Sequence, residues 1–142
     1  MKMNLSNLLK ESRIRKGEED KKQADECIKA AERNIKVAKK LIGDDLDWAF
    51  SVAYNSAVQA TRALMFSEGY YIIGENHHKT IVDYAIIKFG NKFKETADLF
   101  DRMRKKRHDA VYFSAGTISE FETKGAIEFA EGLLKRIKDK ID

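Results

Sequence analysis

The sequence predicts an all-α fold, an up-and-down antiparallel bundle of four long helices with one short additional helix. Its 142 residues include no proline, the residue that most disrupts helix interiors. Apolar residues recur with a period of about 3.6 residues over long stretches, and no stretch alternates convincingly with period two. The loops between these stretches are short, which favours antiparallel neighbours. We expect a single domain over residues 1–142, with a short helix within residues 1–17 and the bundle within residues 19–142.

Glycines delimit the first two helices, which we expect at residues 5–15 and 19–42. Gly17 follows the first helix and Gly43 follows the second, and glycine readily adopts the left-handed conformation that ends a helix. Cys27, the only cysteine, lies on the apolar face of the second helix and is interpreted as a small core residue. The stripe on that face consists of Ala24, Ile28, Ala31, Ile35, Ala38 and Leu41.

A third helix is expected at residues 46–68, with Asp44 or Asp45 as its N-cap and Gly69 at its end. Its sequence is apolar on most faces, which is typical of the most buried helix in a bundle. Its polar minority falls on one strip, formed by Ser51, Asn55, Gln59 and Arg62. Polar groups on a buried helix need partners. The strip is therefore a structural network or subunit contact, or else one wall of a functional cleft.

The remaining helices follow from caps and glycines. Asn76 is expected to cap a helix over residues 77–89, which Gly90 and Asn91 would end. A further helix is expected at residues 92–112. The last helix is expected at residues 118–138, preceded by two overlapping capping boxes, Thr117 with Glu120 and Ser119 with Glu122.

Composition limits the function classes. The net charge of +4 and the pI near 9.1 permit a nucleic-acid partner without requiring one. A single cysteine excludes an internal disulfide and indicates a reducing, cytoplasmic setting. No apolar run approaches the ~18 residues of a membrane span, and the N-terminus lacks the apolar core of a signal peptide. Phosphate-loop, dinucleotide-binding and nucleophile-elbow motifs are absent, so we expect no cofactor and no membrane contact.

The segment from Asp101 to Tyr112 concentrates five cations near the end of a helix. Successive helical residues are rotated by about 100°, which places Arg104 and Arg107 on the apolar face. The apolar residues of that face are Phe93, Ala97, Phe100, Met103, Ala110 and Val111. The cations on the opposite face, which we interpret as solvated charge, are Arg102, Lys105 and Lys106. Because an unpaired buried charge is very costly, the two inward arginines predict a site or a subunit interface. In the first case, Asn55 and Arg62 would face the same cleft.

Two adjacent histidines, His77 and His78, form a second polar cluster. Adjacent residues point about 100° apart on a helix, and neither histidine is followed by a histidine or an acid at i+4. No metal site is therefore expected. We interpret these histidines as capping or network residues, or as contacts to a polar ligand.

These residues together resemble the HEPN domain, a small helical domain named for its occurrence in higher eukaryotes and prokaryotes. The resemblance covers about residues 20–140. Its strongest part is Arg104 to Tyr112, which is similar to the Arg-x-x-Arg-polar-x-Ala-x-Tyr signature of stand-alone prokaryotic members. Its other parts are Ala53-Tyr54-Asn55-Ser56-Ala57, Ala60-Thr61-Arg62-Ala63-Leu64, and Gly69-Tyr70 with His77-His78.

The resemblance implies a homodimer that brings two copies of the signature helix together. Many members are metal-independent endoribonucleases, often toxins encoded beside a small nucleotidyltransferase antitoxin, and others are non-catalytic binding domains. The ribonucleases carry an arginine, usually followed by a polar residue, and then a histidine after four to six intervening positions. In such a pair, arginine stabilises phosphate charge and histidine moves a proton near neutral pH.

Two registers of that motif are open. With Arg107 as the motif arginine, His108 fills the polar position, and the histidine position falls on residues 112–114, where no histidine stands. The general acid/base is then missing. With Arg102 as the motif arginine, His108 has the required spacing, but Met103 takes the polar position and Arg102 points away from the apolar face. We favour the first register.

The leading hypothesis is a dimeric HEPN-type module in which Arg104, Arg107 and His108 line a cleft. The cleft would bind RNA or nucleotide phosphates, or the module would bind a nucleotidyltransferase partner. Tyr112 would bind or orient a phosphate, because a phenol with a pKa near 10 is a poor base. The alternative is a ribonuclease that uses Arg102 or Arg107 with His108. A third interpretation is structural, with the arginines paired to acids of the bundle.

Overall fold

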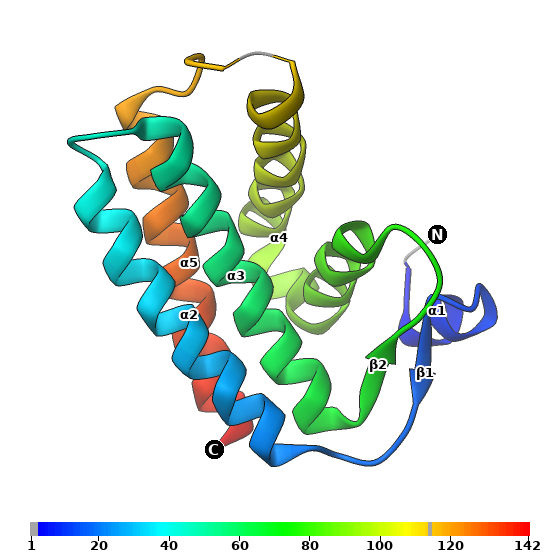
Figure 1. Cartoon of the computed structure of the whole chain (residues 1–142). Coiled ribbons are helices and arrows are strands. Elements are labelled where there is room, and N and C mark those ends of the chain that lie inside the picture. The colour runs from blue at the N-terminus through cyan, green and yellow to red at the C-terminus, as the bar shows by residue number, and fades with distance from the viewer. Residues whose placement is uncertain (1–2, 114) are drawn as a thin grey trace.

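The computed structural model describes residues 3–113 and 115–142, except the side chains of residues 91–97. Figure 1 shows a bundle of helices with a small two-stranded sheet at one side. The elements in chain order are α1 (Leu5–Lys10), β1 (Ile14–Lys16), α2 (Lys21–Leu41), α3 (Leu46–Glu68), β2 (Tyr70–Ile72), α4 (His77–Tyr112) and α5 (Glu120–Ile141). The predicted all-α bundle is confirmed, since the long helices alternate in direction along the chain (Figure 1).

The central position of α3 is as predicted, because α3 packs against α2, α4 and α5. Asp45 caps it by accepting a hydrogen bond from the Trp48 backbone N–H at 3.1 Å. Gly69 ends it with a left-handed φ of 78°. A Cβ at Gly69 would lie 2.5 Å from the Gly17 carbonyl oxygen, so only glycine fits where these two backbone segments cross. The crossing fixes where β2 leaves the bundle.

The N-terminal segment differs from the prediction of one helix over residues 5–15. The helix α1 ends at Lys10, and Ser12 adopts a left-handed φ of 57°. Residues Ile14–Lys16 then pair antiparallel with Tyr70–Ile72, which lie between the helices expected at residues 46–68 and 77–89. Each strand has three residues, too few for a period-two pattern to be visible in the sequence. The pairing places Arg15 opposite Tyr71.

The prediction that Gly90 and Asn91 end a helix is wrong. The helix α4 continues from His77 to Tyr112, and its first and last parts run in different directions in Figure 1. A glycine inside a helix costs only about 1 kcal/mol, and without a proline the hydrogen-bond ladder is not forced to break. The last part of α4, which carries the basic run, is thus covalently and helically continuous with the part that carries His78.

The predicted helix caps are partly confirmed. Ser119 and Glu122 form the expected capping box, in which the Glu122 backbone N–H donates to the Ser119 hydroxyl at 3.0 Å. The helix α5 accordingly begins at Glu120. Asn76 precedes α4 as predicted, in a left-handed conformation with φ 58°, but its side chain makes no capping hydrogen bond.

The core joins α3, α4 and α5 through aromatic rings. The Phe100 ring is fully buried and lies 5.8 Å from the Tyr54 ring and 5.2 Å from the Phe129 ring, measured between centroids. Met103 and Ala110 are buried as the helical count predicted, whereas Val111 is half exposed. Phe93 and Ala97, the other members of that predicted face, lie outside the described side chains. Cys27 is buried as predicted, and burial raises the pKa of its thiol.

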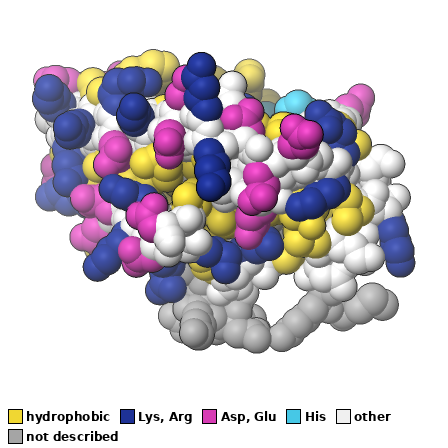
Figure 2. Space-filling model, turned by 90° about the horizontal axis from the view of Figure 1, so that it is seen from below, with side chains coloured by type: hydrophobic (Ala, Val, Ile, Leu, Met, Phe, Trp, Pro, Cys, Tyr) yellow, Lys and Arg dark blue, Asp and Glu magenta, His cyan; other side chains and the backbone are white. Residues whose placement is uncertain are grey.

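Charged side chains of both signs cover the surface. On the face shown in Figure 2, cationic and anionic side chains are interspersed. Ion pairs between helices include Lys39 with Glu131 at 2.9 Å and Lys138 with Glu32 at 3.2 Å. Within the described part of the chain, no helix has the length and apolar character to cross a membrane.

Candidate functional site

The helical count separated the cations of the basic run correctly except for Lys106. Arg104 and Arg107 are half-buried, and Arg102 and Lys105 are exposed. Lys106 is also half-buried, because it reaches across to α5 and lies 3.6 Å from the Glu122 carboxylate. Burial therefore distinguishes the two arginines from Arg102 and Lys105, but not from Lys106.

Arg104 is paired within the helix. Its Nε donates to the Asp101 carboxylate at 3.1 Å, and the ammonium of Lys105 lies 3.3 Å from the same carboxylate. Partial burial alone would raise the Asp101 pKa. The hydrogen bonds from Arg104 and Lys105, together with the charge of Lys79, outweigh that effect and hold the pKa below its ordinary value. Asp101 thus stays ionised at neutral pH and partly neutralises Arg104.

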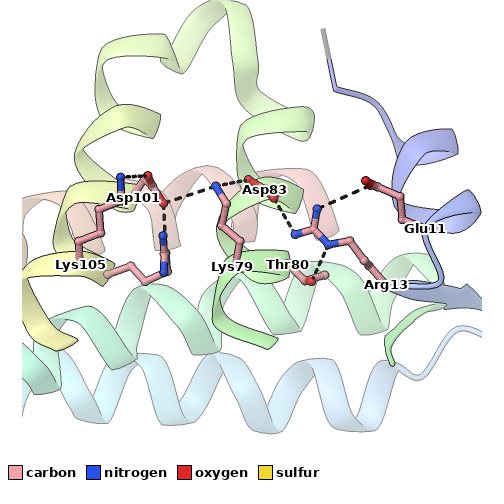
Figure 3. A network of polar contacts seen from close by, with 8 residues as sticks. Glu11, Arg13, Lys79, Thr80, Asp83, Asp101 and Lys105 are labelled. Carbon is pink, nitrogen blue, oxygen red and sulfur yellow. Dashed lines mark hydrogen bonds and ion pairs between the residues drawn. The ribbon is translucent and has the colours of Figure 1, made fainter. Parts of the chain in front are cut away.

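A chain of polar contacts connects Asp101 with the N-terminal segment (Figure 3). Lys79 lies 3.7 Å from Asp101 and donates to Asp83 at 3.1 Å. Arg13 donates to the other Asp83 oxygen at 2.7 Å and to the Thr80 hydroxyl at 3.1 Å. The segment before β1 is in this way tied by charge to the first part of α4, and Lys79 extends the chain of contacts to Asp101.

Arg107 differs from Arg104 because no carboxylate of the described residues pairs with it. Its Nε is buried and has no hydrogen-bond partner in the described part of the chain. A buried donor without a partner costs about 1–3 kcal/mol. The guanidinium lies near Tyr54 and His78, since its charge lowers the pKa of both groups. Arg107 is therefore a half-buried cation with unused hydrogen-bonding capacity.

Tyr54 of α3 and His78 of α4 form the polar centre beside the arginines. The Tyr54 hydroxyl lies 2.9 Å from His78 Nδ1, and the two rings stack with centroids 5.6 Å apart. Burial raises the pKa of the Tyr54 phenol well above its ordinary value, although Arg104 and Arg107 lower it. Loss of water around the ring lowers the His78 pKa, and the charges of Arg107, Arg104 and His77 lower it further. A neutral imidazole can accept a hydrogen bond from the Tyr54 hydroxyl at Nδ1, which leaves Nε2–H available as a donor.

We expect acid to destabilise the protein through His78. Its pKa is lower in the folded chain than the value near 6.5 of an unfolded chain, so the unfolded chain binds a proton first as the pH falls. The contribution of His78 to stability is complete above about pH 6.5 and declines below it. Thermal unfolding between about pH 7.5 and pH 5 should show this decline for the natural chain and a flatter profile for His78→Gln. An equally steep profile in the variant would assign the effect to another group.

A groove of about 390 Å³ lies next to this centre, between α3, β2 and the start of α4. Its polar lining consists of Arg15, Asn55, Gln59, Arg62, His77 and His78. None of the described residues that line it is acidic. The polar strip of α3 is therefore divided. Asn55 is exposed and Gln59 and Arg62 are half-buried at this groove, whereas Ser51 is buried.

His108 and Tyr112 lie elsewhere, at the exposed end of α4. The His108 ring lies 4.7 Å from the Tyr112 ring and 5.7 Å from the Phe113 ring, measured between centroids. His108 is exposed, whereas its neighbour Arg107 is half-buried beside Tyr54 and His78. The charge of Arg107 lowers the pKa of the His78 imidazole.

The predicted residues accordingly fall into three places. Asn55, Arg62, His77 and His78 line the groove, and His108 and Tyr112 lie at the exposed end. Arg104 and Arg107 are half-buried on α4, and their charges lower the pKa of His78. His78 is the residue that the groove and the arginines share. Within the described residues, no group of histidines, cysteines and acids could hold a metal ion.

Three residues of the site were missed by reasoning from sequence. Asp101 stands three positions before Arg104, a spacing at which helical side chains meet. The sequence therefore does contain the signal for this ion pair. Tyr54 lies on a mainly apolar helix, where nothing local distinguishes it from a core aromatic residue. Arg15 enters the groove only because β1 pairs with β2, which no local pattern indicates.

Comparison with known proteins supports the resemblance read from these residues. The family model of the HEPN domain matches residues 24–140, which is most of the chain and includes α3, α4 and nearly all of α2 and α5. No curated protein and no solved structure gives a significant match to the chain. The family match covers both inward arginines and the tyrosine–histidine pair. The chain therefore belongs to the HEPN domain family.

Proposed function

We propose that the chain acts as a homodimeric HEPN-type module that binds RNA or nucleotide phosphates through Arg104 and Arg107, without catalysis. The observation that carries this proposal is the buried Arg107 Nε, which lacks a partner among the described residues. The planar fork of an arginine suits the oxygens of a phosphate, and charge-assisted bonds of this type are strong. A phosphate at this place would satisfy the unpaired donor.

Exposed aromatic side chains support the dimer. Tyr112 and Phe113 at the end of α4, Phe121 at the start of α5 and Trp48 at the start of α3 expose 59–87% of their surface. These helix ends lie at the same end of the bundle (Figure 1). Lys106 with Glu122 and the Gly116 N–H with Asp47 tie them together. Exposed apolar surface of this kind marks protein contacts, here a second copy of the chain or a nucleotidyltransferase partner.

The arrangement of the histidines favours binding over catalysis. A ribonuclease that used Arg107 with His108 would need both groups at one phosphate. In a single copy His108 packs instead against Tyr112 and Phe113. The register with Arg102 as the motif arginine is also unfavourable for catalysis, because Arg102 is exposed on the face opposite the inward arginines.

Binding of a short single-stranded RNA tests the proposal. We expect Arg107→Ala to weaken binding about tenfold or more, because a charge-assisted bond contributes about 1.5–3 kcal/mol. Arg102→Ala is the matched control, since it removes the same charge from the exposed face of the same helix and should change affinity less than about threefold. Fluorescence anisotropy at several salt concentrations gives the affinities, and Arg107→Ala should also reduce the salt dependence.

The same samples test the alternatives. Equal RNA binding by the natural chain and Arg107→Ala would contradict the phosphate-binding role. RNA cleavage in the presence of a metal chelator, lost in His108→Ala, would overturn the non-catalytic proposal in favour of the ribonuclease. Light scattering should give a dimer mass for the natural chain and a monomer for a variant with Phe113→Ser and Phe121→Ser. A monomeric natural chain at high concentration would contradict the homodimer.

A further inference from the structure

The groove beside α3 combines positive charge with unused amides. Arg15 and Arg62 both line it, and no acidic side chain of the described residues does. Neither arginine is neutralised by a carboxylate within ion-pair distance among the described side chains. An anion that entered the groove would therefore meet two guanidinium groups and no repelling carboxylate.

Aromatic rings hold both guanidinium groups in place. The Arg15 guanidinium lies 4.4 Å from the centre of the Tyr71 ring, on the opposite strand. The Arg62 guanidinium lies 5.7 Å from the centre of the Phe66 ring, one turn further along α3. Such cation–π contacts leave the N–H groups at the edge of each guanidinium free for hydrogen bonds. The two cations are thus positioned before any ligand arrives, which reduces the entropy lost on binding.

The remaining polar groups of the groove suit the edge of a nucleobase. Asn55 and Gln59 stand one turn apart on α3, and neither makes a side-chain hydrogen bond within the described part of the chain. A carboxamide presents a hydrogen-bond donor and an acceptor side by side, which complements the donor and acceptor on the edge of a nucleobase. His78 uses Nδ1 for Tyr54, so its Nε2 remains for a ligand. The groove volume of about 390 Å³ falls in the range of small-molecule sites.

We propose that this groove binds a nucleoside monophosphate, with the phosphate on Arg15 and Arg62 and the base edge on Asn55 and Gln59. The site is separate from the Arg107 guanidinium and does not depend on the proposed RNA contact there. Arg15 lies outside the part of the chain that the HEPN model matches, so the strand pair adds a residue of its own to the groove. His78 lines the groove, and the charge of Arg107 lowers the pKa of its imidazole.

Calorimetric titration with AMP, GMP, CMP and UMP tests this inference, with inorganic phosphate and adenosine as partial ligands. At least one nucleotide should bind about tenfold more tightly than phosphate or the nucleoside alone, because both halves of the ligand find partners. Nucleotide binding no tighter than that of inorganic phosphate, or no binding at all at low salt, would overturn the proposal.

Variants assign the binding to the groove. Arg15→Gln and Arg62→Gln should each weaken nucleotide binding about tenfold, the effect of one charge-assisted hydrogen bond. Asn55→Asp changes one exposed side chain to a carboxylate of the same shape, so it should leave the fold intact and weaken binding at least as much. Arg33→Gln, on the exposed face of α2, removes the same charge away from the groove and is the control. Circular dichroism establishes that each variant is folded.

Two further comparisons separate this inference from the proposed function and identify the source of the ligand. Loss of nucleotide binding in Arg107→Ala, with no change in Arg62→Gln and Asn55→Asp, would overturn the groove site while supporting the arginine cluster. Loss in the groove variants with unchanged RNA binding would support the groove alone. Competition by an RNA with a 5′-phosphate, but not by the same RNA with a 5′-hydroxyl, would identify the ligand as an RNA end. Absence of competition by either would identify a free nucleotide.

Discussion

Replacing Phe100 with alanine should lower the free energy of unfolding by about 3–5 kcal/mol. The Phe100 ring is fully buried and contacts Tyr54 of α3 and Phe129 of α5, so its loss removes apolar burial and leaves a cavity among three helices. Phe100 also anchors the last part of α4, which carries Arg104 and Arg107. Urea unfolding followed by circular dichroism measures the change.

Two further variants define the cause. Phe100→Leu retains most of the apolar volume and should cost clearly less than the alanine variant. Phe121→Ala removes the same ring where it is 87% exposed, and should change the stability of the monomer by less than about 0.5 kcal/mol. A Phe100→Ala variant as stable as Phe121→Ala would mean that the last part of α4 does not pack on the bundle as described.

The success of the sequence in predicting the bundle has a physical reason. The helices α2 and α3 begin and end within two residues of the predicted bounds. Their apolar stripes, caps and terminal glycines are local signals that determine helix bounds without help from distant residues. The capping box of Ser119 and Glu122 is of the same kind. Each of these features depends on residues within four positions of one another.

The errors arose where distant residues decide the structure. The pairing of β1 with β2 joins residues more than fifty positions apart, and three-residue strands carry no periodic pattern. Gly90 predicts the end of a helix, yet α4 continues through it, because one glycine inside a helix is tolerated. Position on the helix surface predicted that Arg104 and Arg107 point inward. The i,i+3 spacing also indicates that Arg104 can pair with Asp101. That Arg107 pairs with no acid of the described residues could not be predicted, since it depends on how α4 lies against α3.

The two sites therefore rest on different kinds of information. The arginines of α4 were visible as a break in an apolar stripe, so a single helix sufficed to find them. The groove needs α3, β1, β2 and the start of α4 together, and its sequence signals were the polar strip of α3 and the adjacent histidines His77 and His78. Polar residues on a central helix can therefore indicate a ligand-binding groove as well as a structural network.

Replacing Asp83 with asparagine should lower the free energy of unfolding by about 3 kcal/mol. Asp83 is 2% exposed and accepts hydrogen bonds from Arg13 at 2.7 Å and Lys79 at 3.1 Å. The amide keeps the shape of the side chain but removes the closest and only buried counter-charge of the largely buried Arg13 guanidinium, which then keeps only the exposed Glu11 carboxylate at 3.9 Å. Chemical unfolding at neutral pH measures the loss.

The exposed pair of Lys39 and Glu131 provides the matched control for burial. Its atoms are 2.9 Å apart, close to the Arg13–Asp83 distance, but both side chains are about half exposed. Glu131→Gln should therefore cost less than about 1 kcal/mol, because water screens the charges. A double variant with Arg13→Met and Asp83→Leu should recover much of the stability that Asp83→Asn loses, since it leaves no buried charge unpaired. If the double variant is less stable than Asp83→Asn, the charge pair itself contributes net stability and the penalty of an orphaned arginine is not the main cause.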